Sequence, residues 1–168
     1  MKRLFDIVAF LIFVALVPLT AEVRHPSFLL RLAGSHDSIK PDAAVWKVSE
    51  PVRVIVTMIN QTGRDVHYGL TNPGWDWDMD VRDSKGNPVG ETDLFRQMKE
   101  DLKKRPIITS RNITGTLQPN EKHQDVIEVQ MFYDLTRAGE YSIQVQRVFS
   151  DVAKDPIKSN RLILTITP

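Results

Sequence analysis

The chain of 168 residues carries 22 basic and 21 acidic residues, which gives a formal net charge of +1. This balance does not favour nucleic acid or an anionic membrane surface as a partner. The chain has no cysteine, which excludes disulfides, a thiol nucleophile, cysteine-based zinc sites and lipid attachment through a cysteine.

The first 21 residues have the pattern of a secretory signal peptide. Lys2 and Arg3 form a basic head, residues 4–19 are apolar apart from Asp6, and Thr20-Ala21 offers a small residue for cleavage. The alternative is an uncleaved membrane anchor formed by residues 4–19, but that run is shorter than the roughly 20 residues that a spanning helix needs. We therefore predict cleavage, a single domain over residues 22–168, and a periplasmic or secreted location.

Short runs that are rich in β-branched residues, or that alternate between apolar and polar residues, predict strands along the rest of the chain. Turn-forming Gly, Pro, Asn and Asp separate these runs. The expected strands are 27–32, 45–48, 52–60, 66–70, 75–83, 108–117, 125–131, 139–148 and 161–166.

The spacing of the apolar residues changes once, from strand-like alternation to a helical period, after the turn that ends near Pro88. Leu94, Phe95, Met98 and Leu102 follow helical spacing, with Thr92 or Asp93 available as the N-cap. We predict one amphipathic helix over residues 93–104, inserted in an otherwise β chain.

The run from Gly139 to Val148 shows the clearest alternation. Tyr141 lies at its start, just after a turn. A tyrosine in this position is typical of a tyrosine corner, in which the ring packs inside and the hydroxyl binds the incoming loop. We predict an all-β, immunoglobulin-like, antiparallel two-sheet β-sandwich. An up-and-down barrel is the alternative, and the inserted helix argues against it because it implies a long crossover between sheets.

The inward-facing positions of these strands predict the core. They are Val54, Val56, Met58, Trp77, Met79, Val81, Ile127, Val129, Met131, Tyr141, Ile143, Val145, Leu162, Leu164 and Ile166.

Asp76, Asp78 and Asp80 form a row of carboxylates on the outer face of the predicted strand 75–83. Calcium prefers oxygen ligands of this kind. Side chains two positions apart on a strand lie roughly 6.5–7 Å apart, however, which is too far for one ion unless a loop folds over them. We expect a solvated face, with no metal and no other cofactor.

Trp75 and Trp77 share a face with Met79 and Val81, which favours burial over an exposed platform for sugars or peptides. Trp75 is the more exposed of the two in this interpretation, because it follows the turn at residues 72–74.

Rigid sandwiches present binding residues on loops. The candidate loops are 71–75, 83–89 and 149–159, clustered at one end of the sandwich, and the candidate binding residues are Asn72, Gly74, Trp75, Lys85 and Asn87. An exposed sheet edge that accepts a partner's strand is the second route.

Four runs carry a family resemblance: residues 54–66, 77–89, 117–121 and 138–141. They are similar to the bacterial intracellular proteinase inhibitor (BsuPI) family, which implies a compact β-sandwich and, in some members, inhibition of serine proteases. The chain differs from that family in its export signal and in the helix after Val89. No segment corresponds to a reactive loop, so the resemblance implies no inhibitory residue here.

The four histidines show no spacing typical of metal ligands, and no Gly-x-Ser-x-Gly motif is present. We therefore expect no enzyme, but an exported binding module of the bacterial envelope whose partner is a protein. The alternatives are a BsuPI-like protease inhibitor and a cryptic hydrolase or calcium-dependent carbohydrate-binding domain.

Overall fold

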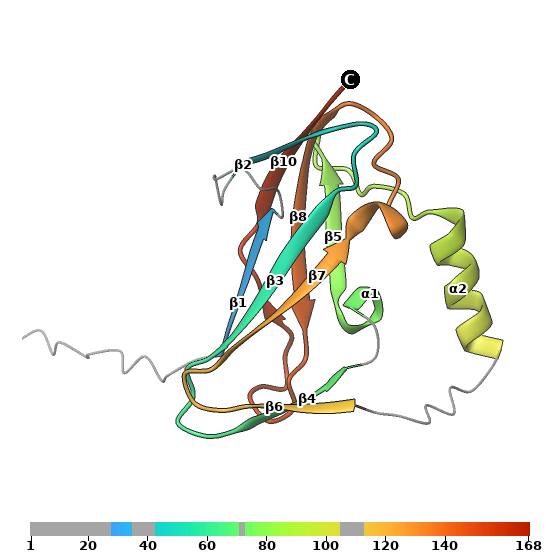
Figure 1. Ribbon diagram of the computed structural model, residues 1–168. Coiled ribbons are helices and arrows are strands. Elements are labelled where there is room, and N and C mark those ends of the chain that lie inside the picture. Colours follow the sequence, from blue (N-terminus) through green and yellow to red (C-terminus); the bar gives the residue numbers. More distant parts are fainter. Residues whose placement is uncertain (1–27, 35–42, 71–72, 105–112) are drawn as a thin grey trace, which may run out of the picture.

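The computed structural model describes residues 28–34, 43–70, 73–104 and 113–168, and its two facing β-sheets enclose one core (Figure 1). The first sheet has the order β1-β3-β7, the second has the order β2-β10-β8-β5 with β9 beside β8, and β4 pairs with β6. The strands are β1 (Phe28–Gly34), β2 (Ala43–Lys47), β3 (Arg53–Asn60), β4 (Val66–Leu70), β5 (Asp78–Asp83), β6 (Ile113–Leu117), β7 (Lys122–Glu128), β8 (Gly139–Arg147), β9 (Ile157–Lys158) and β10 (Leu162–Thr167).

All strand pairs are antiparallel except β2 with β10, which run parallel. β1 lies in the first sheet and β2 in the second, so the chain crosses between the sheets before it pairs with β10. The sequence did not predict this crossing, since the alternation of side chains does not report strand direction. The predicted immunoglobulin-like β-sandwich is confirmed.

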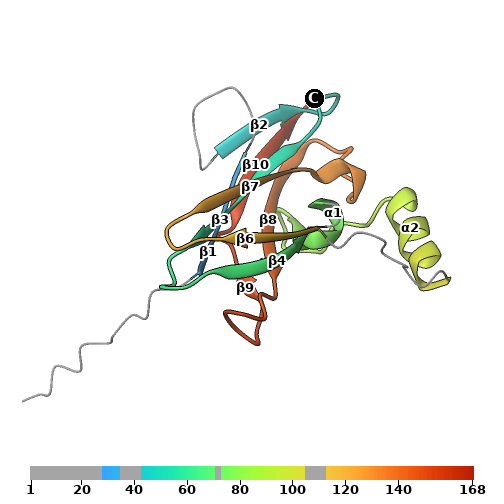
Figure 2. The ribbon, with the colours of Figure 1, turned by 60° about the horizontal axis from the view of Figure 1, so that its bottom comes forward.

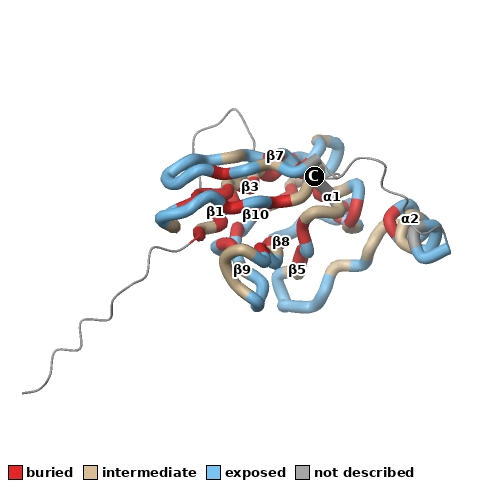
Figure 3. The backbone as a smooth tube through the Cα atoms, turned by 90° about the horizontal axis from the view of Figure 1, so that it is seen from below, coloured by how far each residue is buried: buried red, intermediate tan, exposed pale blue. Residues whose placement is uncertain are grey.

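The core lies between the two layers, and buried residues alternate with less buried ones along β3, β8 and β10 (Figure 3). On β3 the inward residues Val54, Val56 and Met58 are fully buried, and on β8 Ile143 and Val145 are too. Of the predicted core residues only Met131 is not buried, with 48% of its surface exposed.

The error at Met131 has a local cause. We predicted a strand to residue 131, but β7 ends at Glu128 and the chain continues as a 3-10 turn, η1 (Val129–Met131). A 3-10 turn places three residues per turn instead of alternating them, so Met131 points outward while Phe132 and Leu135 are buried.

The predicted strand 75–83 is also wrong at its beginning. Pro73–Asp76 forms a short helix, α1, and the strand starts at Asp78. Proline suits the first position of a helix because its missing N–H needs no partner there. Trp77, Met79 and Val81 are buried as predicted, whereas Trp75 on α1 is half-buried.

The tyrosine corner is confirmed. Tyr141 is buried, and its hydroxyl donates a hydrogen bond to the Arg137 carbonyl at 2.8 Å. This bond fixes the loop that enters β8, because it ties a buried side chain to backbone four residues earlier. Burial, together with the negative charge of Asp134, raises the pKa of Tyr141.

The strands β3 and β4 form one bent ribbon with β6 and β7 (Figure 2). At the bend the side chain of Asn60 donates to the carbonyls of Arg64 (2.8 Å) and Leu117 (2.7 Å), and accepts from the amide (2.9 Å) and the hydroxyl (2.6 Å) of Thr62. Asn60 is fully buried. Its amide therefore replaces the ladder bonds that are missing where the ribbon bends.

The helix α2 (Asp93–Lys104) has the predicted bounds and stands at the side of the sandwich (Figure 1). Among its described side chains only Phe95 is buried. In the described part of the chain, no helix is long and apolar enough to cross a membrane. The predicted signal peptide, residues 1–21, lies outside the described residues, as do residues 108–112 of one predicted strand.

Candidate functional site

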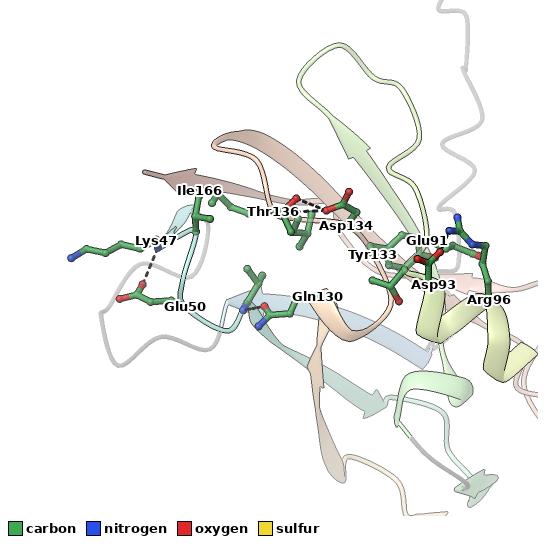
Figure 4. A pocket seen from close by; sticks show the side chains of 14 residues that line it. Lys47, Glu50, Glu91, Asp93, Arg96, Gln130, Tyr133, Asp134, Thr136 and Ile166 are labelled. Carbon is green, nitrogen blue, oxygen red and sulfur yellow. Dashed lines mark hydrogen bonds and ion pairs between the residues drawn. The ribbon is translucent and has the colours of Figure 1, made fainter.

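A groove of about 470 Å³ opens at the end of the sandwich where β2 and β10 finish and β3 begins (Figure 4). Three segments that are distant in sequence supply its walls: the turn from Lys47 to Val52, the first turn of α2 with the residues before it, and the segment 130–136. It is lined by Lys47, Val48, Glu50, Val52, Glu91, Thr92, Asp93, Arg96, Gln130, Tyr133, Asp134, Leu135, Thr136 and Ile166.

The apolar part of the groove belongs to the sandwich core. Val52, Leu135 and Ile166 line it and are almost fully buried, while Val48 exposes 43% of its surface. An accessible apolar side chain beside buried ones makes a surface onto which a ligand's apolar group can pack.

The turn between β2 and β3 is closed by reciprocal hydrogen bonds. The Glu50 carboxylate accepts from the Lys47 amide at 2.9 Å, and the Glu50 amide donates to the Lys47 carbonyl at 2.9 Å. On the same wall the Val52 amide donates to the side-chain oxygen of Gln130. The bond between Val52 and Gln130 holds the turn against the segment that follows β7.

The opposite wall is fixed by the start of α2. Thr92 caps the helix, since its hydroxyl accepts from the Phe95 amide at 3.2 Å and donates to the Met131 carbonyl at 2.8 Å. The Thr92 amide also donates to the Phe132 carbonyl at 2.9 Å. A short bridge between Glu91 and Tyr133 completes the attachment.

The groove has more carboxylates than cations. Its acidic residues are Glu50, Glu91, Asp93 and Asp134, and its basic residues are Lys47 and Arg96. Glu91 pairs with Lys99, and Asp93 pairs with Arg96.

Asp134 is held differently. Its carboxylate accepts from the hydroxyl (2.6 Å) and the amide (3.2 Å) of Thr136, and these bonds lower the pKa of Asp134. Both donors are neutral, and the positive charge of Arg137 adds to the lowering of the pKa of Asp134.

Tyr133 also lies in the wall of the groove. Its hydroxyl donates to the Met79 carbonyl at 2.8 Å. Burial, followed by the negative charges of Glu91, Asp78 and Asp80, raises the pKa of Tyr133 to about 12. The phenol therefore stays neutral and acts as a hydrogen-bond donor within the wall of the groove.

The lining combines charged, polar and apolar side chains. The lining residues include no Ser, His or Cys, so the groove cannot hold a Ser-His or Cys-His pair of the kind that nucleophilic catalysis uses. In the described part of the chain, no group of three or more His, Asp or Glu side chains could hold a metal ion.

The predicted row of three aspartates is divided by the structure. Asp76 lies on α1, and Asp78 accepts from the Gln146 side chain at 2.5 Å. Asp80 pairs with Arg82 and with Arg161, each at 2.8 Å, and the hydrogen bonds from these arginines lower its pKa. Asp80 thus serves an ion-pair network on the outer face of the second sheet.

The predicted binding loops do not share one end of the sandwich. Asp78 pairs with Gln146 and Asp83 pairs with Tyr141, so the loop 83–89 lies at the end of β5 opposite to α1. The segment 149–159 follows the end of β8 and therefore lies at the α1 end. Clustering of all three loops is wrong, and only the loop 83–89 lies at the end that carries the groove.

The predicted binding residues mostly form contacts within the fold. Trp75 packs on Phe95, with ring centroids 5.3 Å apart. Asn87 donates to the Asp83 carboxylate and closes the turn, which leaves Lys85 exposed. Gly74 lies within α1, and Asn72 lies outside the described residues.

Parts of the edges of β1, β5 and β7 are covered against an added strand. The side chain of Asn160 bonds both the amide (2.8 Å) and the carbonyl (3.0 Å) of Leu32 on β1. The Val89 amide donates to the Val81 carbonyl of β5 at 2.9 Å, and α1 packs beside β7. Covered edges prevent pairing with other chains, so they do not favour the strand-addition route.

The sequence analysis missed the groove. Its residues come from turns and helix ends in three separated segments, and no motif connects them. The one local signal was Thr92 as a helix cap, which places the first turn of α2 but does not reveal what packs against it.

The comparisons with known proteins name a family and give two solved structures to which the chain is similar. The chain is similar to a solved CARDB domain from Pyrococcus furiosus, in complex with di-metal ions, with 14% identity over 86% of this chain and 90% of that one and a TM-score of 0.41. It is also similar to PapD-like domain 7 of human CEP192, with 11% identity over 99% and 96% of the two chains and a TM-score of 0.35. No curated protein matches the chain.

A family model, the N-terminal domain of flagellar collar protein C, matches residues 41–167. The β-sandwich implied by the resemblance to the BsuPI family is present, but membership of that family is not shown. By the extent of the match, which covers most of the chain, this protein belongs to the flagellar collar protein C N-terminal domain family.

Proposed function

We propose that this protein is a non-enzymatic β-sandwich module of the bacterial cell envelope that binds another protein through the groove. The observation that carries the proposal is the groove itself, an open concave surface with an apolar floor and a charged rim. Its polar groups form ion pairs and hydrogen bonds within the wall, which suits recognition more than bond cleavage.

The family supports the setting of this function. Its members are described as N-terminal domains of a flagellar collar protein, and we infer that the partner is another component of such a collar. The predicted signal peptide at residues 1–21 supports export to the envelope.

A matched pair of substitutions tests the proposal. Val48 lines the groove and exposes 43% of its surface, while Val148, at the opposite end of the sandwich, exposes 50%. Replacing each by arginine places the same charge and bulk on the same kind of exposed site. Complexes would be stabilised by chemical cross-linking in cells that carry the protein and then sized and identified.

We expect Val48→Arg to abolish a discrete complex that the unchanged chain and Val148→Arg both form. Thermal unfolding of both variants is the control that checks whether the sandwich is intact. A complex that survives Val48→Arg and is lost with Val148→Arg would contradict the proposal and move the binding surface to the other end.

A further inference from the structure

The strand β6 offers a second surface for association, separate from the groove. We propose that the free edge of β6 pairs in antiparallel orientation with the same edge of a second copy of this chain, with Gly115 at the twofold axis. This inference goes beyond the proposed function and does not rest on it, because β4 and β6 lie at the end of the sandwich opposite to the groove (Figure 1).

The ribbon formed by β4 and β6 has two edges, and the edge of β4 is covered. The Asp151 carboxylate accepts from the His67 amide at 3.0 Å, and the Arg147 guanidinium donates to the Gly69 carbonyl. Bonds of this kind occupy backbone groups that an added strand would need. The edge of β4 therefore does not favour pairing with another chain.

The edge of β6 is open. Thr116 lies opposite His67, and Thr114 lies opposite Gly69. Residues directly opposite each other in an antiparallel pair either bond each other or both point away. Since His67 and Gly69 bond outward, Thr114 and Thr116 also direct their amides and carbonyls outward. In the described part of the chain, no hydrogen bond reaches these two amides and two carbonyls, and both side chains are exposed.

The composition of β6 also permits pairing. Its sequence, Ile-Thr-Gly-Thr-Leu, has no charged residue. Natural proteins often place charges on edge strands, where they hinder pairing with another chain. The edge strands of the two larger sheets follow this rule, since β1 carries Arg31, β2 carries Lys47, β5 carries Asp80 and β7 carries Lys122. The strand β6 differs from them, so two copies of it bring no like charges together.

Two β6 strands are self-complementary when the axis passes beside Gly115. Thr114 of each copy then lies opposite Thr116 of the other, and the outward amides and carbonyls form four hydrogen bonds. Threonine pairs on one face of a sheet add to the stability of a strand pair. The contact joins two two-stranded ribbons into one four-stranded sheet, which is more stable than an isolated pair of strands.

Gly115 makes this axis compatible with the packing of Tyr68. The Tyr68 ring occupies the place of a side chain at position 115, because a Cβ there would lie 2.5–2.8 Å from it. In the proposed pair, the side-chain positions of the two Gly115 residues are roughly 4.5–5.5 Å apart. The ends of the two Tyr68 rings therefore meet across the axis, which adds an aromatic contact to the backbone bonds.

Two double variants with the same bulk and different charges test the pairing. In Thr114→Lys, Thr116→Lys, each lysine faces a lysine of the second copy. In Thr114→Lys, Thr116→Glu, each lysine faces a glutamate. Analytical ultracentrifugation of the purified protein and of both variants measures the Kd of the dimer, and thermal unfolding checks that each variant is folded.

We expect the unchanged protein to form a reversible dimer. The two-lysine variant should raise the Kd by roughly 10-fold or more, because like charges opposite each other destabilise a strand pair. The lysine–glutamate variant should dimerise at least as tightly as the unchanged protein. Val48→Arg, in the groove, should leave the Kd unchanged.

Cross-linking tests the register. The chain has no cysteine, so a disulfide can form only between introduced residues. Opposite residues in a hydrogen-bonded antiparallel pair have Cα atoms about 5.5 Å apart, a separation that a disulfide spans. An oxidised mixture of Thr114→Cys and Thr116→Cys proteins should therefore yield the mixed disulfide in preference to either symmetric one.

A protein that stays monomeric at millimolar concentration would overturn the proposal. So would equal dimerisation of the two charge variants, which would place the contact elsewhere on the molecule. Preference for a symmetric disulfide would exclude an axis at Gly115, and loss of the dimer in Val48→Arg would move the contact to the groove.

Discussion

Asn60 is the residue on which the bent ribbon depends most. Its side chain makes four hydrogen bonds in a site without access to water. The substitution Asn60→Ala leaves the carbonyl of Leu117 without its donor, and a buried unpaired group costs more than the lost bond alone. We expect the free energy of unfolding to fall by about 2–4 kcal/mol, measured by urea denaturation.

The variant Thr62→Val provides the control for Asn60→Ala. It removes the exposed hydroxyl contact of the same cluster and leaves the carbonyls paired. A loss as large in Thr62→Val as in Asn60→Ala would contradict the role assigned to the buried amide.

Gly115 is required by the packing of one ring. It lies opposite Tyr68 in the pairing of β4 with β6, and a Cβ at this position would meet the Tyr68 ring at 2.5–2.8 Å. Tyr68 is buried and packs on His123, with ring centroids 5.5 Å apart. We expect Gly115→Ala to destabilise the fold by about 1–3 kcal/mol, the usual cost of overpacking.

A double-mutant cycle checks this cause. In a Tyr68→Leu background the ring is absent, so Gly115→Ala should cost much less there. Gly90→Ala is the matched control, because a Cβ at Gly90 meets nothing within 4 Å. An equal cost of Gly115→Ala in both backgrounds would rule out the clash.

Single positions also show which features of the fold a sequence pattern can predict. Alternation identified the inward residues of β3, β8 and β10, because a half-buried strand has no other way to place its side chains. The prediction failed at Met131, where the chain leaves the strand for a 3-10 turn. The burial of Asn60 and the need for glycine at 115 could not be predicted, since both depend on contacts between segments distant in sequence.

At the scale of elements, Phe95 is the buried residue among the described side chains of α2. The ring of Phe95 lies 5.0 Å from that of Phe132, 5.3 Å from that of Trp75 and 6.3 Å from that of Tyr133, centroid to centroid. A helix of 12 residues is marginally stable without such packing.

We therefore expect Phe95→Ala to release α2 and to cost about 2–4 kcal/mol, toward the lower part of the range for large-to-small core changes. Hydrogen exchange of the α2 amides measures the release, and Leu94→Ala, at a position that exposes 53% of its surface, should not accelerate it. Slow exchange throughout α2 in Phe95→Ala would show that another contact holds the helix.

The elements differ in how predictable they were. Helical spacing and a Thr cap gave α2 with its observed bounds, because both signals are local. The alternation of tryptophan and aspartate from residue 75 indicated a strand, yet the proline at 73 starts a helical turn that ends at Asp76. The parallel pairing of β2 with β10 depends on the path of the chain between sheets, which no local pattern contains.

At the scale of the whole molecule, the tyrosines predict how the fold responds to alkali. Burial is the largest cause that raises the pKa of each of the three tyrosines of this chain, Tyr68, Tyr133 and Tyr141, and that of Tyr133 reaches about 12. A raised folded-state pKa means that the folded form prefers the neutral phenol. The stabilisation is therefore complete below pH 10 and is lost as the pH rises through the folded-state pKa.

We expect little phenolate absorbance from the folded protein at pH 10, and a decline in the urea midpoint between pH 10 and pH 12. The variant Tyr133→Phe should make that decline shallower. Ionisation of all three tyrosines near pH 10 without unfolding would contradict the burial described here.

The arrangement of the whole molecule explains why only part of the site could be predicted. The sequence predicted a sandwich whose candidate loops cluster at one end, whereas the structure separates the loop 83–89, at the end that carries the groove, from the segment 149–159 at the other end. The groove brings together Val48, Thr92 and Thr136 through tertiary packing alone, so the spacing of residues along the chain held no sign of it.

The central claim is that this sandwich binds a protein through the groove. Its most direct test is site-specific photo-cross-linking in cells that carry the protein, with a photoreactive phenylalanine analogue placed at position 48 or at position 148. The account predicts a discrete protein adduct from position 48 and none from position 148. An adduct from position 148 alone, or no adduct from either position, would contradict it.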